Sequence, residues 1–163
     1  MKTQETNLFI VDDDTLMVTA LEHHLHNKFG NGVRISTFND GDSCLKKVDK
    51  DTDIVILDYF MEGKNGLEVL KSIKSINPKT EVIMLSNNKD MVTAVETFRA
   101  GAKDYVVKDN DSWTKITKLV TYIVTEPIRI MVREFGISKF MAIFLLTFVT
   151  MGIITLGVLW AMK

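Results

Sequence analysis

Apolar and polar residues follow two alternating patterns along the first 125 residues. Short apolar runs rich in β-branched residues are typical of buried parallel strands. Longer segments, in which apolar residues recur at spacings of three and four, are typical of amphipathic helices. The predicted strands are 7–11, 33–38, 53–57, 81–85 and 105–107, and the predicted helices are 15–29, 40–48, 66–76, 90–100 and a last one whose apolar stripe runs over 113–124.

Strand and helix therefore alternate five times. This order predicts an α/β fold with a five-stranded parallel sheet, doubly wound, with helices on both faces. Ligands of such sheets bind beyond the carboxyl ends of the strands. The polar residues expected at those ends are Asp12, Asp13 and Asp14 after the first strand, Asp58 after the third, Ser86 after the fourth and Lys108 after the fifth.

These residue types suit phosphoryl chemistry. Clustered carboxylates repel one another, and Mg²⁺ is a hard cation that prefers oxygen ligands. A lysine can pair with a phosphoryl oxygen, a serine hydroxyl can donate to one, and an aspartate can act as the nucleophile. The simpler alternative for Asp14 is that it caps the helix that follows.

The C-terminal part has a different pattern. Residues 140–162 contain no charged side chain. A helix of that length spans about 34 Å, and the hydrocarbon layer of a membrane is roughly 30 Å thick. We therefore expect a transmembrane helix over 139–163, and a long core helix or an oligomer crossover helix is the less favoured alternative. Arg129, Arg133 and Lys139 precede the run, so the positive-inside rule places the N-terminal domain in the cytoplasm.

The predicted organisation is a domain over 1–126, a juxtamembrane linker helix over 127–138 that begins at Pro127, and the membrane helix over 139–163. Twenty basic residues stand against 21 acidic ones, and this balance argues against nucleic acid as a partner. One cysteine excludes an intramolecular disulfide. Gly157 and Ala161 form one small-xxx-small pair, which leaves a homodimer as an open alternative.

Five motifs in their order and spacing resemble those of one known family. Residues 7–125 resemble the receiver domain of two-component response regulators, of the kind found in chemotaxis regulators, which has a flavodoxin-like fold. The motifs are Leu8-Phe9-Ile10-Val11-Asp12-Asp13-Asp14, Asp53-Ile54-Val55-Ile56-Leu57-Asp58, Met61-Glu62-Gly63-Lys64-Asn65-Gly66, Val82-Ile83-Met84-Leu85-Ser86 and Gly101-Ala102-Lys103-Asp104-Tyr105-Val106-Val107-Lys108.

The resemblance implies a role for each matching residue. Asp58 would accept a phosphoryl group from a sensor histidine kinase or a histidine phosphotransfer protein. Asp12, Asp13, Asp58 and the backbone carbonyl of Phe60 would hold Mg²⁺. The remaining roles fall on Lys108, which would pair with the phosphoryl group, on Ser86, which would turn towards it, and on Tyr105, the aromatic switch.

Three positions differ from the family pattern. Glu62 stands where the family usually has Pro, Asn65 where it usually has Asp, and Asp109 follows the lysine where Pro is common. None of these changes removes a group that the chemistry needs. The change after Lys108 affects the expected shape of that loop.

The sequence thus predicts a phosphorelay receiver tethered to the bacterial inner membrane by a single span, with no DNA-binding output domain. It would not be an enzyme beyond its own phosphoryl transfer and autodephosphorylation. One alternative is a phosphatase of the haloacid dehalogenase type that uses Asp12 and Asp14. The other is a membrane adaptor that takes no phosphate.

Overall fold

The computed structural model describes residues 5–135, 144, 146–153, 157 and 160. The chain divides into two compact units, Met1–Tyr122 and Ile123–Lys163. In the second unit, residues 146–153 are helical. None of the helices in the described residues combines the length and hydrophobicity of a membrane span. The membrane helix predicted over 139–163 lies largely outside those residues, so it stays a prediction.

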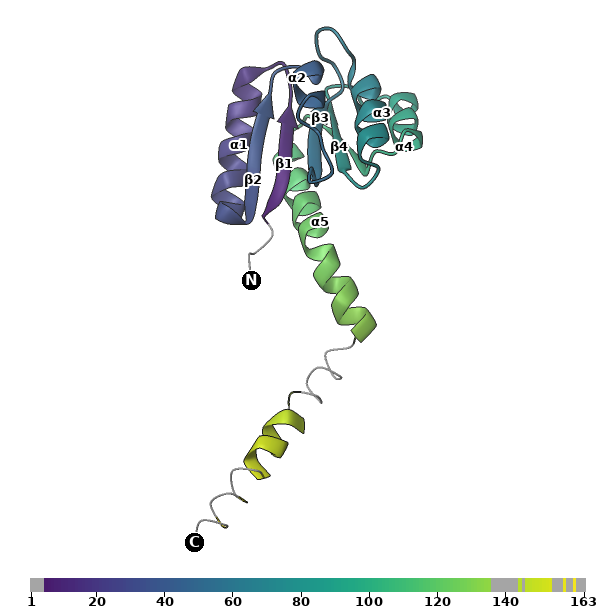
Figure 1. The fold of residues 1–163 in the computed structure, drawn as a ribbon. Coiled ribbons are helices and arrows are strands. Elements are labelled where there is room, and N and C mark those ends of the chain that lie inside the picture. The colour runs from purple at the N-terminus through teal and green to yellow at the C-terminus, as the bar shows by residue number, and fades with distance from the viewer. Residues whose placement is uncertain (1–4, 136–143, 145, 154–156, 158–159, 161–163) are drawn as a thin grey trace. The chain divides into compact units, whose positions relative to one another are not determined.

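The first unit is built on a five-stranded parallel sheet (Figure 1). The strand order β2-β1-β3-β4-β5 is that of the flavodoxin-like doubly wound fold. This confirms the predicted fold class of the N-terminal domain. The strands are β1 (Thr6–Val11), β2 (Val33–Phe38), β3 (Ile54–Asp58), β4 (Glu81–Ser86) and β5 (Asp104–Val107).

A helix follows each strand. The helices are α1 (Thr15–Phe29), α2 (Gly41–Leu45), α3 (Gly66–Ile76), α4 (Met91–Arg99) and α5 (Ser112–Phe135), with a short 3-10 turn η1 (Gly30–Gly32) after α1. The second helix is shorter than predicted because the chain turns after Leu45, where the amides of Lys47 and Val48 both donate to the carbonyl of Cys44.

The helix that was predicted to begin at Pro127 does not begin there. The structure has one helix, α5, that continues through Pro127 to Phe135. A proline inside a helix removes one backbone hydrogen bond and crowds the preceding turn, yet a helix can continue past it with a kink. The proline therefore did not mark a helix boundary. The side chains of residues 127–138 lie outside the described part of the chain.

The core has two halves, one on each face of the sheet, because successive side chains of a strand point to opposite faces. One half joins alternate residues of β1, β3 and β4 to α2 and α3, and its members include Phe9, Val11, Val55, Leu57, Val82, Met84, Cys44, Val69 and Ile73. The intervening strand residues, such as Leu8, Ile10 and Ile56, are buried on the other face, and residues of α1 and α5 such as Leu21 and Ile116 are buried as well. These two helices contact each other where the ring of His24 lies 5.2 Å from that of Trp113.

The strand register brings the carboxyl ends of the strands to one edge. Val11 pairs with Leu57, and Asp58 pairs with Leu85 on the next strand. Ser86, one residue further along, pairs with Val107. Residues that immediately follow these positions therefore meet above the same edge of the sheet, as predicted from their order in the sequence.

Candidate functional site

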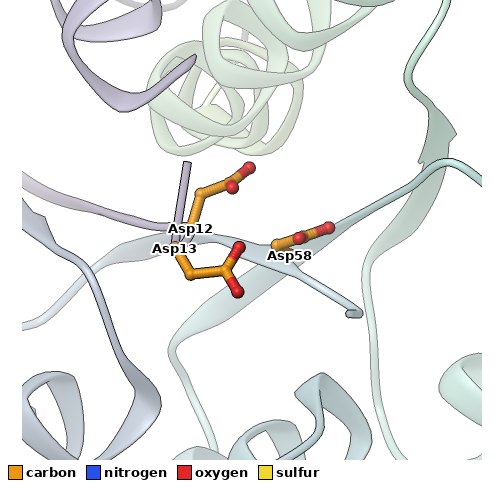
Figure 2. A group of neighbouring side chains, drawn as sticks. All are labelled: Asp12, Asp13 and Asp58. Carbon is orange, nitrogen blue, oxygen red and sulfur yellow. The ribbon is translucent and has the colours of Figure 1, made fainter. Parts of the chain in front are cut away.

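Three carboxylates meet at this edge. Asp12 and Asp13 follow β1, and Asp58 ends the neighbouring strand β3 (Figure 2). One oxygen of each carboxylate lies within 4.8 Å of the other two. Asp12 is 1% exposed and Asp58 is 3% exposed, whereas Asp13 is open to solvent. The structure thus confirms that the acidic pair and the third-strand aspartate form one cluster.

Lys108 supplies the positive charge of the cluster. It follows β5, and its backbone amide donates to the carbonyl of Ser86. Its ammonium Nζ lies 2.7 Å from Asp12 Oδ2 and 3.0 Å from Asp58 Oδ1. The lysine side chain reaches across β4 from β5 to both carboxylates, and it is itself only 13% exposed.

The two oxygens of Asp58 have different surroundings. Oδ1 accepts hydrogen bonds from Lys108 Nζ and from the backbone amide of Tyr59 at 2.9 Å. Oδ2 has no such partner among the described residues, in which every buried side-chain oxygen is hydrogen-bonded. Oδ2 must therefore carry the residual exposure of Asp58. One oxygen is held in place, and the other is open to an incoming electrophile.

The cluster changes the pKa of Asp58. Burial raises the pKa of the Asp58 carboxyl from its usual value of 3.8 to about 6, and the charge of Asp12 adds to the rise, while Lys108 opposes it. For Lys108, burial works against the charged form. Its hydrogen bonds to Asp12 and Asp58 and their charges outweigh burial, and they raise the pKa of the ammonium.

Ser86 and Tyr105 are connected through the backbone of one residue, Asn88. Ser86 is fully buried at the end of β4, and its Oγ accepts from the backbone amide of Asn88 at 3.0 Å. The hydroxyl of Tyr105, which is half-buried on β5, donates to the carbonyl of the same Asn88 at 2.8 Å. A movement of Ser86 towards Asp58 would therefore be felt at Tyr105 through Asn88.

The loop between β3 and α3 closes beside Asp58. The amide of Gly66 donates to the carbonyl of Tyr59 at 2.9 Å. A side chain at Gly66 would clash with the carbonyl oxygen of Asp58, so the loop needs glycine there. The ring of Phe60 is half exposed and meets that of Tyr59 edge-on at 4.9 Å. The metal contact through the Phe60 carbonyl stays a prediction.

Two nearby residues have structural roles. Asp14 caps α1, because its Oδ1 accepts from the amides of Leu16 and Met17 at 3.0 and 3.1 Å. The phosphatase alternative needed Asp14 as a partner of Asp12 in catalysis, and this capping role does not support it. Asp109, which replaces the usual proline, pairs with Lys115 Nζ at 2.9 Å and so fixes the loop after Lys108.

The donor set fits magnesium. The cluster offers carboxylate oxygens from three residues, without nitrogen or sulfur ligands, and hard divalent cations prefer such oxygens. Two of the carboxylates are buried beside a single lysine, so the site holds more negative than positive charge. Asp12, Asp13 and Asp58 are therefore the residues that would hold the ion.

Comparison with known proteins agrees with this geometry. The profile of the response regulator receiver domain matches residues 8–121. The chain belongs to this family. It is 36% identical over 112 residues to the transcriptional regulatory protein ZraR of Klebsiella oxytoca, a match that covers 68% of this chain and 25% of that protein. It is 34% identical over 105 residues to the DNA-binding transcriptional regulator NtrC of Salmonella typhimurium. This match covers 64% of this chain and 22% of that protein.

Solved receiver structures share the fold. The BeF3-activated DrrB receiver domain superposes with a TM-score of 0.66 at 27% identity, and the match covers 74% of this chain and 97% of that one. The chain spans about a quarter of the length of the curated relatives it matches. The resemblance drawn from the five motifs is thus confirmed: the first unit is a phosphoacceptor receiver domain of a two-component system.

The backbone groups of three residues in the site were not predicted from the sequence. The amide of Tyr59 binds Asp58, and the amide of Glu62 binds Asp13 at 3.1 Å. The amide and the carbonyl of Asn88 join Ser86 to Tyr105. Every residue except proline has an amide. No pattern of residue types could therefore have singled out these three.

Proposed function

We propose that this receiver domain accepts a phosphoryl group on Asp58 from a phosphohistidine of a sensor histidine kinase or a histidine phosphotransfer protein. The observation that carries the proposal is the unshared, solvent-facing Oδ2 of Asp58, in a carboxylate whose Oδ1 is fixed by Lys108 and Tyr59. In the transfer, the N–P bond of the donor histidine breaks as an O–P bond forms to Oδ2.

The other residues of the site position and neutralise the charges. Asp12, Asp13 and Asp58 would hold Mg²⁺, which when bound offsets negative charge on the phosphoryl oxygens. Lys108 already contacts Asp58 and can pair with a phosphoryl oxygen as a point charge. The hydroxyl of Ser86 can donate a hydrogen bond to another phosphoryl oxygen. If Ser86 then releases the amide of Asn88, the movement of Asn88 would reach Tyr105, whose hydroxyl donates to the Asn88 carbonyl.

Phosphorylation by a small-molecule donor tests this directly. We expect wild-type protein to incorporate label from radioactive acetyl phosphate when Mg²⁺ is present, and to incorporate none with EDTA. Asp58→Asn should abolish the labelling. Asp51→Asn should leave it unchanged, because Asp51 is exposed and lies outside the cluster.

The outcomes separate the alternatives. Full labelling of Asp58→Asn would refute Asp58 as the acceptor, and an unlabelled wild type would favour the adaptor. The domain itself acts on no separate substrate in this proposal. Its chemistry is limited to its own phosphoryl transfer and the hydrolysis of its own aspartyl phosphate, so any phosphate release from acetyl phosphate should be lost in Asp58→Asn.

We also propose that residues 139–163 tether the receiver to a bacterial inner membrane, with the receiver in the cytoplasm. The support is the uncharged run over 140–162 and the basic residues before it. The described apolar side chains of this region agree, since Phe148 and Met151 are each 69% exposed and such surface favours a lipid or protein environment.

Fractionation tests the tether. Full-length protein should stay in the membrane pellet through carbonate and high-salt washes, and a chain that ends at residue 138 should be released. Release of the full-length chain by salt alone would refute the membrane span. Tethering would raise the local concentration of the receiver near a membrane kinase without any new contact.

A further inference from the structure

The three carboxylates of the cluster are not held equally. Asp12 accepts hydrogen bonds from Lys108 and from the amide of Asp14. Asp58 likewise accepts two hydrogen bonds, one from Lys108 and one from the amide of Tyr59. Within the described residues, the Asp13 side chain makes one hydrogen bond, in which Oδ2 accepts from the backbone amide of Glu62 at 3.1 Å. The orientation of the exposed carboxylate therefore depends on that single amide.

The amide of Glu62 is placed by the loop that surrounds it. The two ends of the loop are joined by the bond from Gly66 to Tyr59. Gly63 has a φ of +85°, a conformation that suits glycine, and it reverses the chain directly after Glu62. The only other hydrogen bond that the crest of the loop, residues 60–64, makes in the described structure is from Lys64 to Asp42 on α2.

The bond exists because residue 62 is not proline. Proline has no backbone N–H, so the residue that usually stands at this position of the family could not donate to Asp13. The carboxylate has about four acceptor sites on its two oxygens. One amide at Oδ2 therefore fixes the group and leaves sites free for a cation.

We propose that Glu62 is a positioning residue for the metal site, and that its peptide N–H, rather than its side chain, holds Asp13 ready for Mg²⁺. This inference rests on the proposed function, in which Asp13 is a metal ligand. Groups that hydrogen-bond to metal ligands fix the orientation of those ligands, and their loss commonly costs about 10- to 100-fold in affinity. Asp13 is exposed, so we expect the lower end of that range.

The test compares two substitutions of one residue in the full chain. Glu62→Pro removes the amide hydrogen, and Glu62→Gln keeps it while removing the charge. Isothermal titration with Mg²⁺ alone should show binding about 10-fold weaker for Glu62→Pro and within about 3-fold of wild type for Glu62→Gln. Circular dichroism and thermal melting would establish that both variants are folded.

A second measurement needs no substitution. Amide hydrogen exchange of metal-free wild-type protein should show protection at Glu62 and none at the neighbouring Gly63, for which no hydrogen bond is present in the described structure. This result keeps the inference testable if Glu62→Pro does not fold.

The outcomes distinguish the positioning role of Glu62 from the proposed function of the domain. Equal Mg²⁺ affinity of Glu62→Pro and wild type, an equal loss in Glu62→Pro and Glu62→Gln, or an unprotected Glu62 amide would each overturn the positioning role alone. A wild-type protein that binds no Mg²⁺ and takes no label from acetyl phosphate would overturn the proposed function and this inference with it.

Discussion

Neutralising Asp58, the proposed phosphoacceptor, should make the domain more stable. Asp58 is 3% exposed and shares its site with the charge of Asp12, and its pKa in the folded protein is about 6 instead of 3.8. An acid with a raised pKa is more costly to ionise in the folded state than in the unfolded state. Asp58→Asn removes that cost, while the ion pair between Lys108 and Asp12 stays in place.

The size of the effect follows from the two pKa values. One pKa unit corresponds to about 1.4 kcal/mol, so the ionised Asp58 destabilises the fold by about 3 kcal/mol. Below pH 3.8 the carboxyl is protonated in both states, and the cost is absent. It grows as the pH rises from about 4 to about 6 and is constant above that. The gain from Asp58→Asn should therefore be about 2–3 kcal/mol at pH 7.5 and much smaller at pH 4.

Urea unfolding followed by circular dichroism, in EDTA at both pH values, measures this gain. Asp51→Asn is the matched control, because Asp51 is exposed and its carboxylate has no hydrogen bond or ion pair in the described structure. The control should change the free energy of unfolding by less than about 0.5 kcal/mol. An Asp58→Asn protein no more stable than wild type at pH 7.5, or equally stabilised at pH 4, would show that Asp58 is not a buried carboxyl with a raised pKa.

Three further experiments test other parts of the domain. Lys108→Met should destabilise the fold by about 3 kcal/mol in urea unfolding without Mg²⁺, because it leaves two buried carboxylates unpaired; no loss of stability would contradict the ion pairs. Burial, with a smaller contribution from the charge of Asp40, raises the pKa of the Cys44 thiol to about 12, so a thiol reagent at pH 8 should label it in urea but barely in native protein. Gly66→Ala should destabilise by more than about 2 kcal/mol through its clash with backbone, whereas Gly32→Ala, which meets no atom within 4 Å, should cost less than about 0.5 kcal/mol; similar melting temperatures of the two would refute this reading of the loop.

The alternation of strands and helices, and the residues at the strand ends, could be predicted from the order of amino acids alone. Continuous apolar runs such as 54–57 are typical of inner strands of a parallel sheet, which are buried on both faces. Because parallel strands end at one edge, the order of the chain was enough to predict that Asp12, Asp58, Ser86 and Lys108 would meet. The identities of these side chains then indicated the chemistry, and the family match agreed.

Helix boundaries were less well determined, because they depend on contacts outside the segment. Pro127 predicted the start of a new helix, and α5 continues through it. Cys44 and its neighbours formed a shorter helix than their pattern indicated, since the chain turns back as soon as Cys44 is packed against α3 and the sheet. The helix preference of a single residue predicts a boundary poorly, because the hydrogen bond lost at a proline is a small cost compared with the packing of the whole segment.

The arrangement of the charges in the site could not be predicted from the sequence, because it depends on the folded chain. Lys108 reaches across β4 to Asp58, and the amide of Glu62 binds Asp13, so both contacts join residues that are distant in sequence. The unshared Oδ2 of Asp58 also depends on which groups the fold places around it. The raised pKa of Asp58 has the same origin, because burial and the charge of Asp12 act through space. A sequence shows which charged groups are present. Their interaction energies depend on the distances between them and on their exposure to water, and both are set by the fold.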